Sequence, residues 1–307
     1  MKDIKIVITY KNADLDCVAS AYAYSEFLNK KGEKANYFIS GIVQSEVDIV
    51  CSMFNIKLAN VIKKVEDEQV IVVDTNTYSS IDFVNIEQVI EVIDHHPKSS
   101  DVFRNAVVDI EQIGAVCTII AERYKKDNIS ISRESAILLY YGIISNTVNL
   151  NSKVTTPRDI DMCEWLKKQC VEIDDNLISK IFEEKSKFDI QDLRRMMEVE
   201  EKFILGNDEL IIGQLELTDA KKFLKKYKTN IDSILNEVKN QYGVSLIFLN
   251  IIDIFLGYHI IYSPYSDTIN YLEEKYQFQF NGDNFIENKI VLRKEIKQYL
   301  RNVLEKI

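Results

Sequence analysis

Short runs of β-branched residues alternate with stretches of helical spacing near the start of this chain, and this alternation limits the fold more than any other feature. The strand-like runs lie at 4–9, 35–40, 70–74 and 89–94, with helical stretches at 17–31 and 45–54. The first helix is expected to stop at Gly32, a residue type favoured just beyond a helix end. Continuous apolar strands that alternate with helices are typical of a parallel sheet covered on both faces. We therefore predict an α/β fold with a mostly parallel sheet covered by helices.

The rest of the chain predicts a helical region and then a second group of strands and helices. The helical region comprises 114–127, 132–145 and 157–169, the last opening with Thr156 as a cap and Pro157 at the first helical position. We interpret GIISNTVNLNSKVTT, residues 142–156, as a polar loop. Beyond it we expect strands at 209–217, 244–253 and 258–263, and helices at 219–242, 265–275 and 292–307.

The length of the chain favours two domains. With 307 residues it exceeds the size at which one hydrophobic core usually suffices. The charge-rich, strongly helical stretch 182–203 is where we place the junction between them. We predict a first domain at 1–185 and a smaller α/β domain at 195–307.

Composition excludes several classes of function. No apolar run approaches the roughly 18 residues of a membrane span, and acids interrupt the start of the chain before a signal-peptide core could form. A net charge of −10 disfavours duplex nucleic acid as a partner. The five cysteines contain no CxxC pair and are odd in number, which argues against disulfides and zinc knuckles. We expect a cytoplasmic protein with reduced cysteines, no membrane contact and a small anionic ligand.

Acidic residues follow several of the predicted strands. Asp14 and Asp16 come directly after the first strand, and Asp74 and Asp94 end two others. Because ligands of parallel sheets bind beyond the carboxyl ends of the strands, these carboxylates should gather at one edge. An Asp before a helix is also a common N-cap, so Asp14 and Asp16 alone carry little weight.

The sequence VIDHHP adds two of the chain's three histidines to the same edge. It places His95 and His96 next to Asp94 at the end of a strand. Imidazole beside carboxylates is a typical ligand set for manganese, iron, cobalt or zinc, whereas carboxylates alone favour magnesium or calcium. The residues therefore indicate a metal site at this edge.

Four motifs give the chain a specific resemblance. NADLD, VIVVDTN, DHH and GIISNT are similar, in order and spacing, to the signature motifs of the DHH phosphoesterase superfamily. Within it, the length, HHP and the late LRKEIKQYL look most like family II manganese-dependent inorganic pyrophosphatases and the related exopolyphosphatases. The resemblance implies that 1–185 is the DHH metal-binding catalytic domain and 195–307 a DHHA2-like substrate-binding domain, with the active-site cleft between them.

The resemblance also implies a role for each site residue. Asp14 and Asp16 would each bind one of two metal ions, Asp74 would bridge both, and His95 would be a further ligand. His96 would stand beside the substrate phosphate as a donor or acid. Asp94 would orient a ligand.

Four further residues match substrate-binding positions. Arg293 and Lys294 correspond to a basic pair that holds phosphate, and Lys11 and Asn12 flank the acid pair within reach of a phosphate. In this chemistry two cations about 4 Å apart hold a bridging water as hydroxide and neutralise charge on phosphorus, while the basic residues position the substrate.

Two positions depart from the family pattern. Tyr10 stands where the pyrophosphatases have a histidine, and a neutral phenol is a poorer ligand for a divalent ion. Asn146 stands where the superfamily has an aspartate that binds the second metal, and its amide brings no net charge. We keep Asn146 among the catalytic residues together with His96 and Asp94.

We therefore expect a metal-dependent phosphohydrolase that acts on phosphoanhydrides, such as pyrophosphate or short polyphosphate, through a dinuclear-type site. Manganese is the expected ion, with magnesium or cobalt as alternatives, and the resemblance implies a homodimer. Because of Tyr10 and Asn146, the alternative is a degenerate member that binds phosphate compounds or a partner with little or no turnover. A nuclease or cyclic-dinucleotide phosphodiesterase is disfavoured, since no glycine-rich nucleotide-contacting motif is found near the end.

Overall fold

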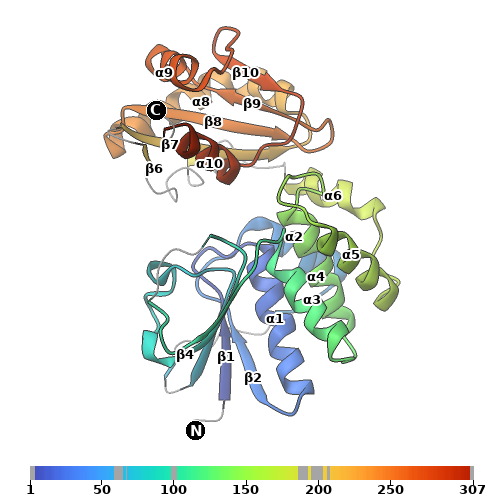
Figure 1. Ribbon diagram of the computed structural model, residues 1–307. Coiled ribbons are helices and arrows are strands. Elements are labelled where there is room, and N and C mark those ends of the chain that lie inside the picture. Colours follow the sequence, from blue (N-terminus) through green and yellow to red (C-terminus); the bar gives the residue numbers. More distant parts are fainter. Residues whose placement is uncertain are drawn as a thin grey trace. The chain divides into compact units, whose positions relative to one another are not determined.

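The computed structural model describes residues 4–58, 65–66, 68–97, 102–185, 193–194, 203–205 and 208–304. The chain divides into two compact units, Met1–Ile181 and Phe182–Ile307. Each unit contains a sheet with helices packed on it (Figure 1). The predicted α/β class with a parallel first sheet and a second, smaller α/β domain is confirmed.

The first unit is built around a five-stranded sheet in the order β2-β1-β3-β4-β5, and all of its strand pairs are parallel. The strands are β1 Ile4–Ile8, β2 Lys34–Phe38, β3 Gln69–Val73, β4 Val89–Asp94 and β5 Val107–Ile110. The strand order reverses at β1 and β3, which is where ligands bind in sheets of this order. The acids that follow β1 and β3 therefore stand at the expected place for a site.

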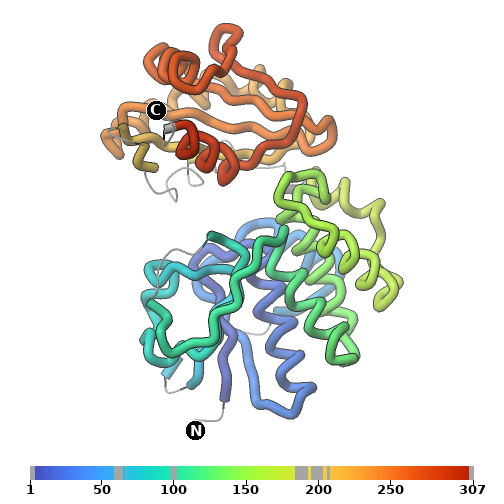
Figure 2. The backbone as a smooth tube through the Cα atoms, in the orientation of Figure 1, coloured from blue at the N-terminus to red at the C-terminus, as the bar shows by residue number. Residues whose placement is uncertain are grey.

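Helices cover one face of this sheet in two layers. Helix α1, Leu15–Lys30, lies on β1, β2 and β3, and the other helices pack on it or beside it (Figure 1). They are α2 Ser45–Phe54, α3 Val116–Lys126, α4 Arg133–Asn146 and α5 Pro157–Gln169. Helix α6, Asn176–Lys185, crosses into the second unit. The continuous trace in Figure 2 follows this alternation of strand and helix through residues 4–54.

The opposite face of the sheet differs from the prediction. Its apolar side chains pack against two short 3-10 helices, η1 Tyr78–Ile81 and η2 Ile86–Gln88, and against loop residues such as Val84 and Phe103. The strands remain buried, but among the described residues this cover is made by single turns and loops rather than α-helices.

Helix ends follow the sequence signals. Asp14 caps α1 by accepting a hydrogen bond from the Cys17 amide, and Gly32 takes a left-handed backbone at φ +87° just beyond its end. Thr156 and Asp159 form a reciprocal capping box at the start of α5, with Pro157 at the first position. These boundaries were predicted from the sequence and are confirmed.

Residues 142–145 were predicted both as the end of the 132–145 helix and as the start of a polar loop. The helix prediction is confirmed and the loop prediction is wrong there, because α4 continues through Asn146. The helix continues because Gly142, Ile143 and Ile144 are buried against the rest of the unit, so the apolar face of α4 extends further than the polar residues after it suggested. Asn146 therefore stands at the end of a rigid helix.

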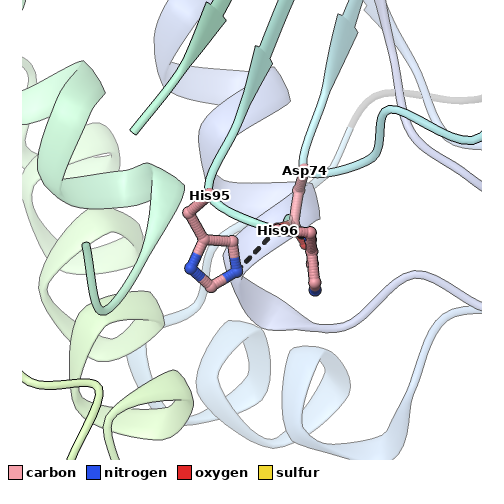
Figure 3. Close-up of side chains that lie close together, drawn as sticks. All are labelled: Asp74, His95 and His96. Carbon is pink, nitrogen blue, oxygen red and sulfur yellow. Dashed lines mark ion pairs between the residues drawn. The ribbon is translucent and has the colours of Figure 1, made fainter. Parts of the chain in front are cut away.

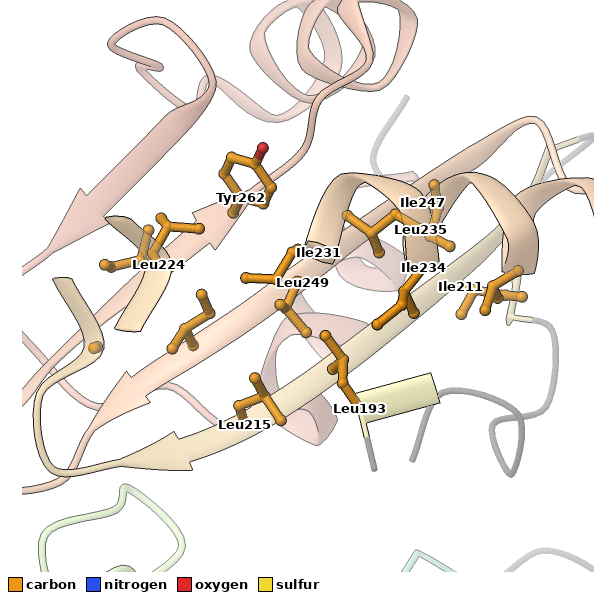
Figure 4. Close-up of a cluster of buried hydrophobic side chains, with 14 of the residues drawn as sticks. Leu193, Ile211, Leu215, Leu224, Ile231, Ile234, Leu235, Ile247, Leu249 and Tyr262 are labelled. Carbon is orange, nitrogen blue, oxygen red and sulfur yellow. The ribbon is translucent and has the colours of Figure 1, made fainter. Parts of the chain in front are cut away.

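The second unit contains a mixed five-stranded sheet in the order β10-β9-β8-β7-β6, in which only β7 and β8 pair in parallel among the described strands. The strands are β6 Phe203–Leu205, β7 Asp208–Leu217, β8 Leu246–Asp253, β9 Tyr258–Tyr262 and β10 Asn284–Glu287. Helix α8, Ala220–Tyr242, packs on one face through the apolar cluster drawn in Figure 4. Helices α9, Ser266–Tyr276, and α10, Arg293–Leu304, pack on the other.

A row of polar side chains crosses the face of this sheet that carries α10. His259 Nδ1 lies 2.8 Å from Asn250 Oδ1, and Asn250 Nδ2 donates to the Val291 carbonyl at 2.9 Å. Gln214 Oε1 accepts from the Arg293 amide at 2.5 Å. The row therefore holds the backbone where α10 begins.

Strands β5, β6 and β10 were not predicted. They contain only four, three and four residues, and β5 exposes Val107 and Val108. Runs this short give little periodicity to detect. The predicted junction helix at 182–203 falls largely outside the described residues.

Among the helices that are described, none combines the length and the apolar character needed to cross a bilayer.

Candidate metal centre

The candidate site lies at the carboxyl edge of the first sheet. Asp14 and Asp16 follow β1, Asp74 follows β3, and His95 and His96 follow β4. Parallel strands deliver these side chains from separate segments to the same edge, as the sequence predicted. Asp16, Asp74 and His95 are buried.

Asp74, His95 and His96 form a group of three residues whose ligand atoms lie close enough together to hold a metal ion. One ligand atom from each lies within 4.8 Å of the others. Asp74 Oδ1 is 3.4 Å from His95 Nε2 and 3.9 Å from His96 Nδ1, and the side chains converge from the ends of β3 and β4 (Figure 3). Asp74 itself takes a left-handed backbone at φ +61°, an uncommon conformation for a residue with a side chain.

The ionised form of Asp74 is poorly compensated by the described residues. Its Oδ1 is buried and has no hydrogen-bond partner in the part of the chain that the structure describes. Burial, followed by the nearby charges of Asp14 and Asp16, raises the pKa of Asp74 well above its ordinary value. A buried acceptor of this kind fits a cation.

The backbone fixes the orientation of His95. Its Nδ1 lies 2.9 Å from the carbonyl oxygen of Ile113, which only accepts, so Nδ1 carries the proton. Nε2 then presents its lone pair toward Asp74. A histidine held in this way by a carbonyl is the usual arrangement of a metal ligand.

Asp94 stabilises the turn that carries both histidines. Its Oδ1 accepts from the amides of His95 and His96 at 2.8 and 3.2 Å and from His96 Nδ1 at 2.9 Å, and its Oδ2 accepts from Asn76. Although burial opposes ionisation, the hydrogen bond and charge of His96 lower the pKa of Asp94. The side chain of His96 is half exposed, and its Nε2 has no protein partner among the described contacts.

Asp14 stands beside a second buried acid. Burial, then the charges of Glu46 and Asp16, raise the pKa of Asp14 to about 6. Glu46 accepts from the Leu15 amide at 2.9 Å and from Ser145 Oγ at 2.5 Å, and so joins α2 to α1 and α4. The Tyr10 hydroxyl lies 3.5 Å from the Asp14 amide, and burial with the charges of Asp14 and Asp74 raises the pKa of Tyr10.

Asp16 is bonded to the start of another helix. Its two oxygens accept from the amides of Val116 and Cys117, both at 2.8 Å, in the first turn of α3. The N-cap residue of α3 is Ala115, which has no side-chain acceptor. Asp16, which lies on α1, therefore accepts the hydrogen bonds that an N-cap side chain would otherwise accept.

Asn146 joins three segments of the site. Its Nδ2 donates to Asp16 Oδ2 at 3.0 Å and to the Gly114 carbonyl at 2.9 Å, and it lies 3.4 Å from His95 Nε2. Gly114 fits only without a side chain, because an added Cβ would lie 2.6 Å from Thr147 and 2.7 Å from Asp159.

The predicted substrate-binding residues are more exposed. Lys11 pairs with Asp82 at 2.7 Å, and Asn12 has a left-handed backbone whose carbonyl accepts from Gln44 at 3.4 Å. Arg293 and Lys294 lie in the first turn of α10 in the second unit. Their roles as phosphate contacts stay predictions, as do the individual ligand roles of Asp14 and Asp16.

Sequence reasoning missed Glu46, Asn76 and the carbonyl of Ile113. From the sequence alone, Glu46 is an ordinary acidic residue in the first turn of a helix, and Asn76 is an ordinary loop residue. Only the packing of α2 beside α1, and of the Asn76 loop against Asp94, brings them to the site.

The donor set fits a divalent cation. It offers an unpaired buried carboxylate oxygen, a correctly oriented imidazole lone pair and further carboxylates nearby. Mixed oxygen and nitrogen ligands suit manganese and neighbouring transition ions, and magnesium less well.

Comparisons with known proteins agree with this geometry. Residues 5–143 match the model of the DHH family, N-terminal domain. A Bacillus pumilus protein named "Probable manganese-dependent inorganic pyrophosphatase" is 30% identical over 257 residues, covering 81% of this chain and 82% of its own. A protein of the same name from Brevibacillus brevis is 26% identical over 297 residues, covering 94% and 93%.

A solved structure shows the same fold. It is that of a Methanococcus jannaschii protein described as a candidate family II inorganic pyrophosphatase, with a TM-score of 0.78 and 23% identity over 98% of this chain and 99% of that one.

Proposed function

This chain belongs to the DHH phosphoesterase superfamily, with manganese-dependent inorganic pyrophosphatases among its relatives, and we propose that it is a metal-dependent phosphohydrolase. Its proposed substrates are phosphoanhydrides, either pyrophosphate or a short polyphosphate. Manganese is the proposed ion, with magnesium or cobalt as alternatives, and the small phosphate compound is its proposed partner.

One observation carries the proposal. The buried Oδ1 of Asp74, which has no hydrogen-bond partner among the described residues, faces a His95 nitrogen that carries no proton and so presents a lone pair. A purely structural carboxylate at this depth would be expected to have hydrogen-bond donors on both oxygens. The pair therefore supports a site that is completed by a metal.

The chain's own residues have distinct proposed tasks. Asp74 and His95 hold the ion, with Asp14 and Asp16 beside them, and a bound divalent cation would supply Lewis-acid stabilisation of charge on phosphorus and a nucleophilic water of lowered pKa. His96, oriented by Asp94, is exposed enough to donate a proton or hydrogen bond to a phosphate oxygen. Lys11 and Asn12 flank this edge, and Arg293 and Lys294 are the proposed phosphate contacts of the second domain.

Phosphate release tests the proposal. Purified protein is incubated with manganese, cobalt or magnesium and with pyrophosphate, tripolyphosphate or a panel of nucleotides. Release from pyrophosphate or tripolyphosphate that depends on the ion and is lost in Asp74→Asn is the expected result. Folded protein that binds manganese but releases phosphate from no compound would overturn it.

A second candidate function rests on Asn146 and Tyr10. The Asn146 amide bonds to Asp16 and to Gly114, and Tyr10 is a phenol of raised pKa beside Asp14, so both positions offer neutral groups. A chain with these replacements that binds phosphate compounds without turnover is the alternative. Binding of pyrophosphate with no release, combined with release after Asn146→Asp and Tyr10→His are introduced together, would favour it.

A further inference from the structure

The Asn146 side chain donates hydrogen bonds to two acceptors at the site. Its nitrogen lies 3.0 Å from Asp16 Oδ2 and 2.9 Å from the Gly114 carbonyl oxygen. Both neighbours are acceptors only, so the group between them must be a donor, and the amide orientation follows from this chemistry. Turning the amide over would set its oxygen against two other oxygens.

Both carboxylate oxygens of Asp16 accept hydrogen bonds from protein groups. Oδ1 accepts from the Cys117 amide, and Oδ2 accepts from the Val116 amide and from Asn146. Amides at a helix N-terminus favour a negative charge, since they are unpaired donors at the positive end of the helix dipole. The Asp16 carboxylate is therefore stabilised by protein groups alone.

Asp74, in contrast to Asp16, has a carboxylate oxygen that accepts no hydrogen bond from the described residues. It is as deeply buried as Asp16, yet its Oδ1 has no hydrogen-bond partner within the described residues. His95 Nε2 lies 3.4 Å from that oxygen and His96 Nδ1 3.9 Å from it, and His96 Nδ1 also donates to Asp94. The unmet demand for positive charge is therefore at Asp74 and not at Asp16.

We propose that this chain holds one divalent ion tightly, at Asp74 and His95, and that the Asn146 amide takes the place of a second ion by joining Asp16 and Gly114. Asn146 is then a positioning residue. It keeps Asp16 against α3 and stands 3.4 Å from His95 Nε2, on the side of the imidazole that faces the ion site. This inference rests on the proposed function and departs from the dinuclear site that the family resemblance implied.

Aspartate at position 146 should reverse the arrangement. It would place a second carboxylate beside Asp16 and against the carbonyl of Gly114, with no donor between them. Such a cluster is unfavourable alone but well suited to a cation. We therefore expect Asn146→Asp to gain an ion site and to depend on that ion for stability.

Ion stoichiometry tests the inference without substrate. Manganese is titrated into the full chain and followed by calorimetry and by electron paramagnetic resonance, which distinguishes isolated from spin-coupled ions. The expected result is one tight ion per chain for the natural protein. For Asn146→Asp we expect two ions with a coupled spectrum, together with a lower unfolding midpoint in chelator that manganese restores. Asn151→Asp, an exposed position with the same change of charge, is the matched control and should bind one ion.

The outcomes separate this inference from the proposed function. Two tight ions in the natural chain would overturn it, even if Asn146→Asp fails to fold. A single ion in a folded Asn146→Asp would also overturn it. Phosphate release is measured on the same preparations: release with two tight ions rejects the inference and keeps the function, whereas one ion with no release keeps the inference and rejects the function.

Discussion

Nε2 of His95 faces Oδ1 of Asp74 at 3.4 Å, while the other ring nitrogen of His95 is bonded to the carbonyl of Ile113. The pair joins the ends of β3 and β4. The backbone positions both residues, since the Ile113 carbonyl holds His95 and Asp74 itself has a left-handed backbone conformation. A site made in this way is organised before an ion arrives, which reduces the cost of ordering the ligands on binding.

His95→Ala is expected to abolish tight manganese binding. The variant removes the imidazole whose lone pair is directed at Asp74. Mutating a residue that only supports a metal ligand lowers metal affinity by up to about 100-fold, so loss of the ligand itself should lower manganese affinity by more than that. Calorimetric titration with manganese measures it. His96→Ala is the matched histidine control, and a loss of similar size in that variant would make His96 a third ligand.

His96→Asn is expected to impair phosphate release more than ion binding. The half-exposed imidazole is oriented by Asp94 and would act on the substrate, and loss of a general acid or base typically costs about 10²–10⁴-fold in rate. The measurement is kcat for pyrophosphate at saturating manganese. An unchanged kcat would remove His96 from the proposed chemistry.

Acid should act in opposite directions on the ion-free and ion-bound protein. The pKa of Asp14 is about 6 in the fold against an ordinary value of 3.8, because the carboxyl is buried and faces Glu46 and Asp16. The folded state thus binds this proton more tightly than the unfolded state, so this group makes ion-free protein more stable as the pH falls through 6. The same proton competes with a cation, and manganese affinity should fall by about tenfold per pH unit below that point.

Thermal unfolding at pH 5 and pH 7, in chelator and in manganese, checks this expectation. The ion-dependent rise in the unfolding midpoint should shrink at the lower pH. Asp14→Asn, which cannot titrate, should show a smaller change with pH. An ion-dependent rise that is equal at both pH values would contradict the assignment.

Gly114→Ala is expected to destabilise the first unit. The new Cβ would lie 2.6 Å from Thr147 Cγ2 and 2.7 Å from Asp159 Oδ2, both in buried side chains. Overpacking of this kind typically costs about 1–3 kcal/mol. Urea unfolding measures the loss, and adding Thr147→Ser, which removes the methyl group, should restore part of it. No rescue by the serine would point to the Asp159 contact instead.

The sequence located the edge of the sheet where the candidate site lies, because each acid or histidine directly follows an apolar strand. Asp74 and His95 could be placed in this way without knowledge of how the helices pack. The partners of Asn146 and the position of Glu46 could not, since they depend on how α4 and α2 lie against α1, and side-chain periodicity does not encode such distant contacts. The same limit explains why the loop prediction failed at 142–145, where burial rather than local polarity decides the end of α4.

Asn250→Ala is expected to weaken the second unit and the start of α10. The Asn250 side chain is buried between His259 and the Val291 carbonyl, and its loss leaves both without this partner. An unsatisfied buried polar group costs about 1–3 kcal/mol. Because Val291 lies two residues before the start of α10, the proposed phosphate contacts Arg293 and Lys294 should be less well ordered. KM for pyrophosphate should therefore rise more than kcat falls.

The control is Asn240→Ala, an exposed asparagine on α8, which should leave both stability and kinetics unchanged. A loss of stability in Asn250→Ala without any change in KM would show that the polar row only supports the sheet. A rise in KM without loss of stability would instead assign it to the presentation of α10. We expect both effects. The row of polar side chains on this face of the sheet also forms hydrogen bonds with the backbone of Val291 and Arg293, at the start of the helix that carries Arg293 and Lys294.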